Sequence, residues 1–456
     1  MGLLLNPPHT ASDKFGPVTS EPVNLSPHRR VGGLTDGAEE AIAELAIEAF
    51  AAIGSIWREP WSAPPLPSGL SGPWTEITRR VLRCGASCAA VAAMDADPVV
   101  GPAIRSGQLY AGVGGSGGIL QAELLPLDLV EGAAMELAAR AQELTEHDLV
   151  RTAVANLRKL RSGIAGDTYD GWMLTAFRGV HLLPSVPIST PWGELVDAER
   201  MSSEMWAPDG CSAVLATPIR SWLRPKSWEP SRMFGSEAQQ LSLDSQRIAQ
   251  LVSYGLALGS NHRDPATAVP VGAGELLPTG MGGRAGALRL VSFHNRQSPI
   301  STDEATEAVQ WMKRLDAVAL DRIDLALRRL VRGLAERLDY LDSLIDAVIA
   351  WENLVESRAQ PTKSVLWGIF TLTGSGTWSK SRIDKVYKAR SDVVHGELPD
   401  YAHSKDFASD ALCIGLDALR FLLDDHADKL DMTSEQRVAA LGFVVSEGDT
   451  VAASPG

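Results

Sequence analysis

The sequence predicts a multidomain chain, with an N-terminal α+β region of unknown fold over residues 36–300 and a C-terminal all-α helical bundle over 301–430. The length of 456 residues exceeds the ~100–200 residues of a typical domain. The upstream region mixes helical periods with strand-like runs, whereas the downstream region is almost continuously helical in pattern. Residues 1–35 are rich in proline, serine and glycine and are expected to be disordered or loop-rich, and 431–456 are expected to form a tail.

The upstream elements are predicted from apolar periodicity and from breaker residues. Asp36 can cap a first helix, whose apolar stripe runs to Ile53. The remaining expected upstream elements are helices over 75–93, 127–162 and 237–258 and strands over 211–219 and 287–294.

The downstream helices are predicted from the same patterns. Pro361 is expected to end the second downstream helix, and Gly396 is expected to end the third. The expected helices span 302–338, 340–357, 381–395 and 404–429. Amphipathic helices with short connections of this kind form a bundle.

Composition argues against several classes of protein. No uncharged apolar run of 18 residues exists, so we expect no membrane span, and Met1–Asn6 lack the basic start of a signal peptide. We therefore expect a cytoplasmic protein. As a separate expectation, we assign it no cofactor. Cys84 and Cys88 could belong to a zinc site, but buried thiols on a helix are the favoured interpretation. The net charge of −14 argues against binding nucleic acid over the whole surface, but a local basic site remains compatible with it.

A glycine-rich segment formally matches a phosphate-binding pattern. Gly112, Gly114 and Gly117 fit G-x-G-x-x-G, but the apolar run before them is short, and Pro126 interrupts the segment after them. A flexible loop is the favoured interpretation.

The helix expected over 381–395 is the one local basic site. Between Lys380 and His395 it carries five basic and two acidic side chains. His395 falls at the helix C-terminus, where the dipole favours imidazolium and where histidine can transfer a proton near neutral pH. Arg390 lies five residues earlier, about 140° away around an ideal helix. One copy therefore makes a poor two-residue site, whereas two copies could direct two arginines and two histidines at one phosphate.

The segment Tyr387-Lys388-Ala389-Arg390-Ser391-Asp392-Val393-Val394-His395-Gly396 resembles the Arg-x4-6-His signature of HEPN domains, in particular the ApeA-like group. Residues 344–354 resemble the helix that precedes this motif in that group. The likeness covers about residues 310–430. It implies a metal-independent endoribonuclease in which an RNA 2′-hydroxyl attacks the adjacent phosphate. His395 would act as acid or base, and Arg390 would stabilise the charged transition state.

The resemblance also implies a homodimer that completes the site, RNA as the partner, and a role as a defence or toxin effector. We expect support for the pair from Ser391, Asp392, Glu352 and Asp346, and phosphate contacts from four basic side chains of the helix: Lys380, Arg382, Lys385 and Lys388. A second interpretation stays open for Glu352 and Asp346, namely capping or arginine pairing on the bundle surface.

Two functions from different classes remain open. The intact Arg390/His395 pair favours a ribonuclease whose upstream region is a sensor or regulator. Ser391 stands where many nucleolytic members carry Asn, His or Asp, which favours a non-catalytic HEPN scaffold for dimerisation or partner binding.

Overall fold

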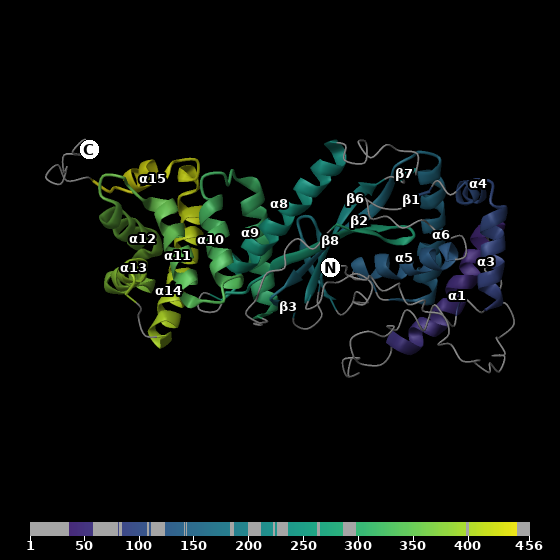
Figure 1. The fold of residues 1–456 in the computed structure, drawn as a ribbon, viewed down its shortest axis with the longest axis horizontal. Helices are drawn as coiled ribbons and strands as arrows, with labels where there is room; N and C mark the ends of the chain where they lie inside the picture. The colour runs from purple at the N-terminus through teal and green to yellow at the C-terminus, as the bar shows by residue number, and fades with distance from the viewer. Residues whose placement is uncertain are drawn as a thin grey trace, which may run out of the picture.

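The computed structural model describes residues 36–57, 81, 84–106, 109–110, 124–140, 142, 144–182, 187–198, 211–221, 224–225, 236–261, 265–285, 298–397 and 401–444. The chain is elongated, with a cluster of N-terminal helices at one end, a sheet in the middle and the C-terminal bundle at the other end (Figure 1). The expected loop over 1–35, the strand over 287–294 and the glycine pattern at Gly112, Gly114 and Gly117 lie outside the described residues.

The N-terminal helices are α1 (Gly37–Trp57), α3 (Gly85–Ala96), α4 (Val100–Arg105), α5 (Leu125–Ala139) and α6 (Glu146–Ile164). Asp36 caps α1 as expected, since its carboxylate accepts from Ala38 N at 2.9 Å. The single helix expected over 127–162 is wrong, because the chain leaves the helix at Arg140 and restarts where the Thr145 hydroxyl accepts from Asp148 N. The helix expected over 75–93 overlaps α3, and residues 75–80 lie outside the described part.

One arginine fixes the ends of three of these helices. Arg161 of α6 is 19% exposed and pairs with Asp36 at 2.9 Å, Asp97 at 2.5 Å and Glu39 at 3.3 Å. The hydrogen bond from Arg161 is the main reason why the pKa of Asp36 lies below its usual value.

The sheet has six antiparallel strands in the order β4-β5-β6-β2-β8-β9. They are β2 (Tyr169–Arg178), β4 (Ile188–Thr190), β5 (Gly193–Asp197), β6 (Ala213–Ser221), β8 (Val269–Leu277) and β9 (Gly280–Ala285). The strand expected over 211–219 is confirmed as β6. The described residues also form two smaller strand pairs: β3 (Val180–Leu182) with β10 (Ser298–Ile300), and β1 (Leu109–Tyr110) with β7 (Arg224–Pro225).

Helices cover both faces of the sheet, and alternating residues of β6 show this. Val214 and Ala216 pack in a cluster with Met135 of α5. Ala213 and Leu215 pack in a second cluster that contains residues of α8 (Ser236–Gly259) and α9 (Thr302–Ala317). Because side chains alternate along a strand, both faces carry apolar residues, and the strand forms a continuous apolar run in the sequence.

The helix α8 is confirmed, but the single helix expected over 302–338 is wrong. The chain leaves α9 at Val318, which is extended, and α10 begins at Asp324 (Asp324–Ala335). Ile323 in this turn is fully buried, so its apolar character reflects packing rather than helical period. The α8 and α9 backbones approach closely, because a Cβ on Gly259 would lie 2.3 Å from Ala308 N.

The C-terminal bundle contains α10, α11 (Tyr340–Val355), α12 (Pro361–Thr377), α13 (Lys380–Val394), α14 (Tyr401–Asp425), a 3₁₀ turn at Ala427–Lys429 and α15 (Ser434–Ala440). The helices expected over 340–357, 381–395 and 404–429 are confirmed in all but their bounds. From the sequence Pro361 is expected to end a helix, and it is in fact the first residue of α12, because proline is well suited to the first helical turn. Residues 434–440, which the sequence places in the tail, form α15.

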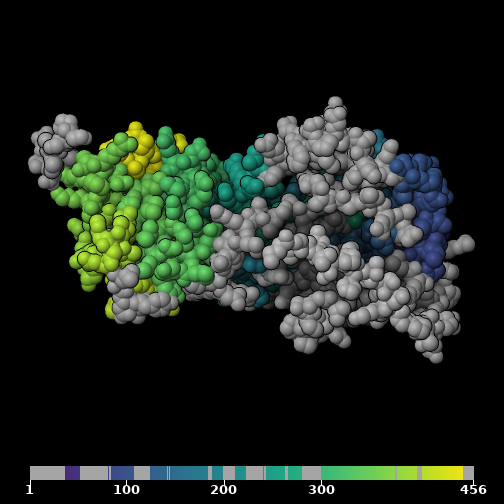
Figure 2. All heavy atoms as spheres, viewed as in Figure 1, coloured from purple at the N-terminus to yellow at the C-terminus, as the bar shows by residue number. Residues whose placement is uncertain are grey.

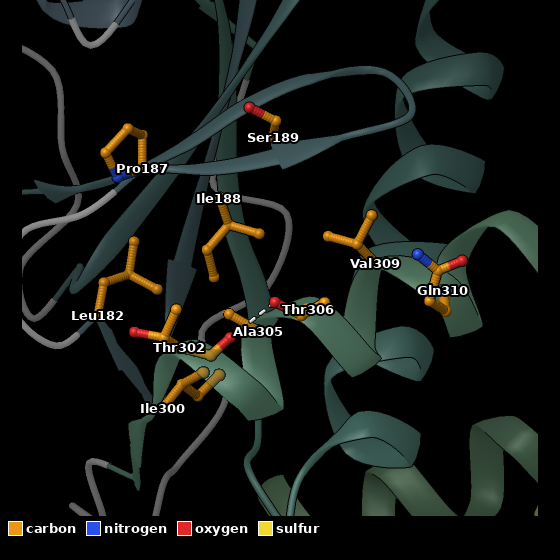
Figure 3. A pocket seen from close by; sticks show the side chains of 10 residues that line it. All are labelled: Leu182, Pro187, Ile188, Ser189, Ile300, Thr302, Ala305, Thr306, Val309 and Gln310. Atoms are coloured by element: carbon orange, nitrogen blue, oxygen red, sulfur yellow. Dashed lines mark hydrogen bonds between the residues drawn. The ribbon is translucent and has the colours of Figure 1, made fainter.

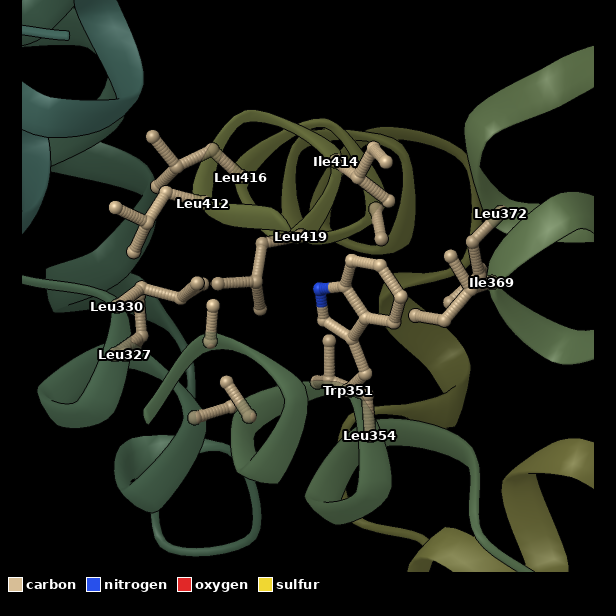
Figure 4. Packing of buried hydrophobic residues seen from close by; sticks show 14 of the residues in the cluster. Leu327, Leu330, Trp351, Leu354, Ile369, Leu372, Leu412, Ile414, Leu416 and Leu419 are labelled. Atoms are coloured by element: carbon tan, nitrogen blue, oxygen red, sulfur yellow. The ribbon is translucent and has the colours of Figure 1, made fainter. Parts of the chain in front are cut away.

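Trp351 of α11 lies at the centre of the bundle core. It is fully buried among leucine and isoleucine side chains of α10, α11, α12 and α14, and its indole N–H donates to Ala411 O at 3.1 Å (Figure 4). In the space-filling view the bundle residues form one block at the end of the molecule opposite the N-terminal helices (Figure 2). The fold class is therefore confirmed at the level of an α+β part followed by an all-helical part.

Two buried arginines donate hydrogen bonds to backbone carbonyls at helix ends. Arg420 of α14 donates to Leu258 O at 2.7 Å and to Ser260 O at 3.2 Å, which satisfies carbonyls at the end of α8 and ties the bundle to the sheet layers. Arg437 of α15 donates to Leu354 O at 2.7 Å, and burial lowers its pKa to about 10. No helix among the described residues is long and apolar enough to cross a membrane.

Candidate functional site

The candidate site lies on α13 and at its C-terminal end. Ser379 caps the helix, because its hydroxyl accepts from Arg382 N at 3.2 Å. Ile383, Val386 and Ala389 form the buried stripe that packs this helix into the bundle. Residues beside the stripe are therefore half-buried and face neighbouring helices, whereas the opposite side is exposed.

Arg390 lies at the edge of the buried stripe and reaches α11. Its Nη2 donates to Glu352 Oε2 at 3.3 Å, and the two side chains are 23% and 19% exposed. Its Nε is buried and has no hydrogen-bond partner among the described residues. One donor of the guanidinium fork is thus held by a carboxylate, while Nε is left unsatisfied.

Glu352 is held by two side chains of α13. Besides Arg390, Tyr387 donates from its hydroxyl to Glu352 Oε1 at 3.3 Å. Burial raises the pKa of Glu352, and the Arg390 charge opposes that rise. Burial and the neighbouring Glu352 carboxylate likewise raise the pKa of Tyr387. Sequence reasoning missed Tyr387, although its i, i+3 spacing from Arg390 places both on one helix face.

His395 caps the end of α13 and is exposed. Gly396 comes next with φ +87°, its N–H donates to Val393 O, and Glu397 N donates to Asp392 O at 2.9 Å. This is the Schellman arrangement, and it needs a left-handed residue after the cap. The helix end expected at Gly396 is confirmed, and the His395 imidazole lies at the surface.

The structure does not bring the two residues of the predicted pair into contact within one chain. No hydrogen bond or ion pair joins Arg390 to His395, both of which the structure describes. Arg390 pairs with Glu352 of α11, and His395 is the exposed residue that caps α13. Ser391 and Asp392 between them are half-buried.

The remaining predicted site residues fall into two groups. Lys380, Lys385 and Lys388 are exposed on the outer side of α13. Arg382 instead pairs with Asp410 of α14 and lies over the Phe407 ring at 4.9 Å, so it joins two helices. The structure does not bring Asp346 to Arg390.

Asp346 has arginine partners of its own on another side of α11. It is 1% exposed, and its carboxylate binds Arg329 at 2.5 Å and Arg337 at 2.6 Å. Sequence reasoning leaves arginine pairing open for both Asp346 and Glu352, and the structure gives both of them arginine partners.

The described residues include no group of three or more acidic, histidine or cysteine side chains arranged to hold a metal. Cys84 is buried as expected and caps α3 by accepting from Ser87 N at 3.4 Å, while burial raises its pKa. Cys88 is exposed, so the expectation of a buried thiol is wrong there.

A separate cavity of about 240 Å³ lies between β4, β10 and α9 (Figure 3). Leu182, Ile188, Ile300 and Val309 give it a mostly apolar wall, and none of the ten described residues that line it is charged. Without an acid, a base or a cation, this cavity is a weaker candidate for chemistry than α13.

Two carboxyl groups lie near the start of α5, the half-buried Asp128 and the buried Glu131. Burial raises the pKa of Asp128 to about 7 and that of Glu131 to about 8. Oε1 of Glu131 has no hydrogen-bond partner among the described residues.

No known protein family, curated protein or solved structure matches this chain.

Proposed function

We propose that the chain is a metal-independent endoribonuclease of the HEPN type, with Arg390 and His395 of two protomers forming one composite site. The observation that carries the proposal is the arrangement at the end of α13. There an exposed imidazole ends a helix that bears Arg390, held by Glu352, and three exposed lysines. The resemblance of residues 387–396 to the HEPN signature supports the same assignment.

The reaction is attack of an RNA 2′-oxygen on the adjacent phosphorus. A neutral His395 takes the 2′-hydroxyl proton as the new P–O bond forms, and a protonated His395 of the second protomer gives a proton to the departing 5′-oxygen. Arg390 stabilises the added negative charge on the phosphate oxygens. The products are a 2′,3′-cyclic phosphate and a 5′-hydroxyl. Lys380, Lys385 and Lys388 bind neighbouring phosphates of the strand.

A two-fold contact resolves the geometry of the pair. Within one chain Arg390 pairs with Glu352 and does not bond to His395, whereas a two-fold axis near the end of α13 would place the His395 of one protomer beside the Arg390 of the other. Val394, adjacent to His395, is 56% exposed and offers apolar surface for this contact. The upstream sheet and helices then serve as a sensor or regulator, and the protein acts as a defence or toxin effector.

The test is cleavage of end-labelled single-stranded RNA by the full chain. We expect cleavage with and without EDTA, and products with 2′,3′-cyclic phosphate ends. A substrate with one 2′-deoxy nucleotide resists cleavage at that linkage only, because it lacks the attacking oxygen. Cleavage at the 2′-deoxy linkage would contradict the mechanism. Absence of cleavage of every RNA tried, in the dimeric full chain, would favour the alternative of a non-catalytic HEPN scaffold.

A further inference from the structure

A groove of about 460 Å³ lies where the sheet layers meet the bundle. Its walls come from α8 and β8 on one side and from α10 on the other, and these elements are neighbours in Figure 1. Its volume falls within the ~300–1,000 Å³ of typical small-molecule sites. This groove is separate from the α13 site, because it contains none of the residues assigned there.

Three arginines of α10 line the groove: Arg328, Arg329 and Arg332. Arg328 pairs with Asp324 and is 60% exposed, and Arg329 pairs with Asp346 at 2.5 Å. Each of these two guanidinium groups is therefore held in place by a carboxylate while it lines the groove.

Arg332 is farther from its carboxylate partner than Arg328 and Arg329 are from theirs. Its Nε lies 3.7 Å from Glu336 Oε2, beyond hydrogen-bond distance, and this buried nitrogen has no hydrogen-bond partner in the described part of the chain. The Arg332 side chain as a whole is 40% exposed, so its guanidinium can turn toward an anion in the groove, and an N–H that lacks an acceptor gains by that move.

The rest of the groove offers apolar surface and uncharged hydrogen-bonding groups. Leu325, Val331 and Val269 line it with apolar surface, and Leu325 is 45% exposed. Gln246 and Gln250 of α8 line it one helical turn apart, and both are exposed. Carboxamides both donate and accept hydrogen bonds, which suits the edge of a heteroaromatic ring.

We propose that this groove binds a free nucleotide. Its phosphates lie on Arg332 and Arg328, its base packs against Leu325 and Val331, and the glutamine amides contact the base edge. Arginine is favoured for phosphate because its planar fork matches two phosphate oxygens. The proposal does not depend on RNA cleavage, since it concerns binding at a separate place in the fold.

The test is isothermal titration of the full chain at fixed ionic strength with AMP, GMP, CMP, UMP, ATP and pyrophosphate. We expect at least one nucleotide to bind, and to bind about tenfold or more tightly than pyrophosphate, because the base adds contacts. Arg332→Gln removes a charged donor and weakens binding about tenfold. Gln250→Glu places a negative charge in the groove and weakens binding as well.

Arg322→Gln is the matched control, because Arg322 is exposed in the turn before α10 and does not line the groove. Its affinity for the same nucleotide should equal that of the wild type. Equal affinity for pyrophosphate and nucleotide, or equal weakening by Arg322→Gln and Arg332→Gln, would overturn the proposal. It would also be overturned if a 5′-phosphorylated oligoribonucleotide bound through Arg332 while every mononucleotide failed to bind.

Discussion

The Arg390–Glu352 pair predicts that substitutions at the two residues affect the free energy of unfolding in a non-additive way. At 3.3 Å and an effective dielectric constant of about 20, the attraction between the two charges is about 5 kcal/mol. The pKa of Glu352 is nevertheless raised, mainly because burial disfavours its charged form, and this opposes the attraction of Arg390. The intact pair therefore adds little net stability, whereas removal of one partner leaves the other buried without compensation.

We expect Arg390→Gln to lower the free energy of unfolding by about 1–3 kcal/mol, because Glu352 then lacks its cation. Glu352→Gln costs about 1 kcal/mol, since an amide oxygen still accepts from Arg390 and Tyr387. The double variant should resemble Glu352→Gln, so the coupling energy equals in size the effect of Arg390→Gln alone, about 1–3 kcal/mol. Urea unfolding measured by tryptophan fluorescence compares all four proteins.

The pH dependence gives an independent check. A carboxyl group whose pKa is higher in the folded state binds more protons there, so stability falls as pH rises from about 4.5 through the raised pKa of Glu352. The Glu352→Gln variant lacks this contribution to the slope. Effects of the two single substitutions that add to within about 0.5 kcal/mol would refute the coupling.

The remaining predictions concern other parts of the chain. Glu131→Gln should stabilise the protein above pH 8 by a few kcal/mol, at most about 5, because the pKa of Glu131 rises from 4.5 to about 8 on folding. Near pH 4 the substitution should have no effect, and unfolding curves at both pH values test this. Gly396→Ala should cost about 1–2 kcal/mol in urea unfolding, because φ +87° disfavours a side chain, and an unchanged midpoint would contradict the assigned turn. Light scattering should show the full chain as a dimer, and Val394→Glu should shift it toward monomer; a wild-type monomer at tens of micromolar would contradict the two-fold site.

Local signals in the sequence predict the helices whose ends are marked by capping residues. Asp36 before α1 and Gly396 after α13 act through hydrogen bonds within a few residues, so they are visible without the fold. The break between α9 and α10 lacks proline and glycine, and it depends on the burial of Ile323 in the assembled core. Pro361 is compatible with both the end and the start of a helix, so the sequence alone does not show that it opens α12.

The site shows the same division between local and long-range information. The i, i+3 spacing that puts Tyr387 and Arg390 on one face of α13 is set by helix geometry alone, and the structure agrees with it, because both side chains reach Glu352. Which carboxylate meets Arg390 depends on how α11 packs against α13, so the sequence could not choose between Glu352 and Asp346. The arginine groove joins residues about 80 positions apart in the chain and has no local signature.

The central claim is that His395 transfers a proton during RNA cleavage. The most direct measurement is the single-turnover cleavage rate of one labelled RNA by the wild type, His395→Ala and the matched control His403→Ala, an exposed histidine of α14. We predict that His395→Ala lowers the rate by a factor of about 10²–10⁴, while His403→Ala leaves it within about twofold of wild type. Equal rates for wild type and His395→Ala would contradict the claim.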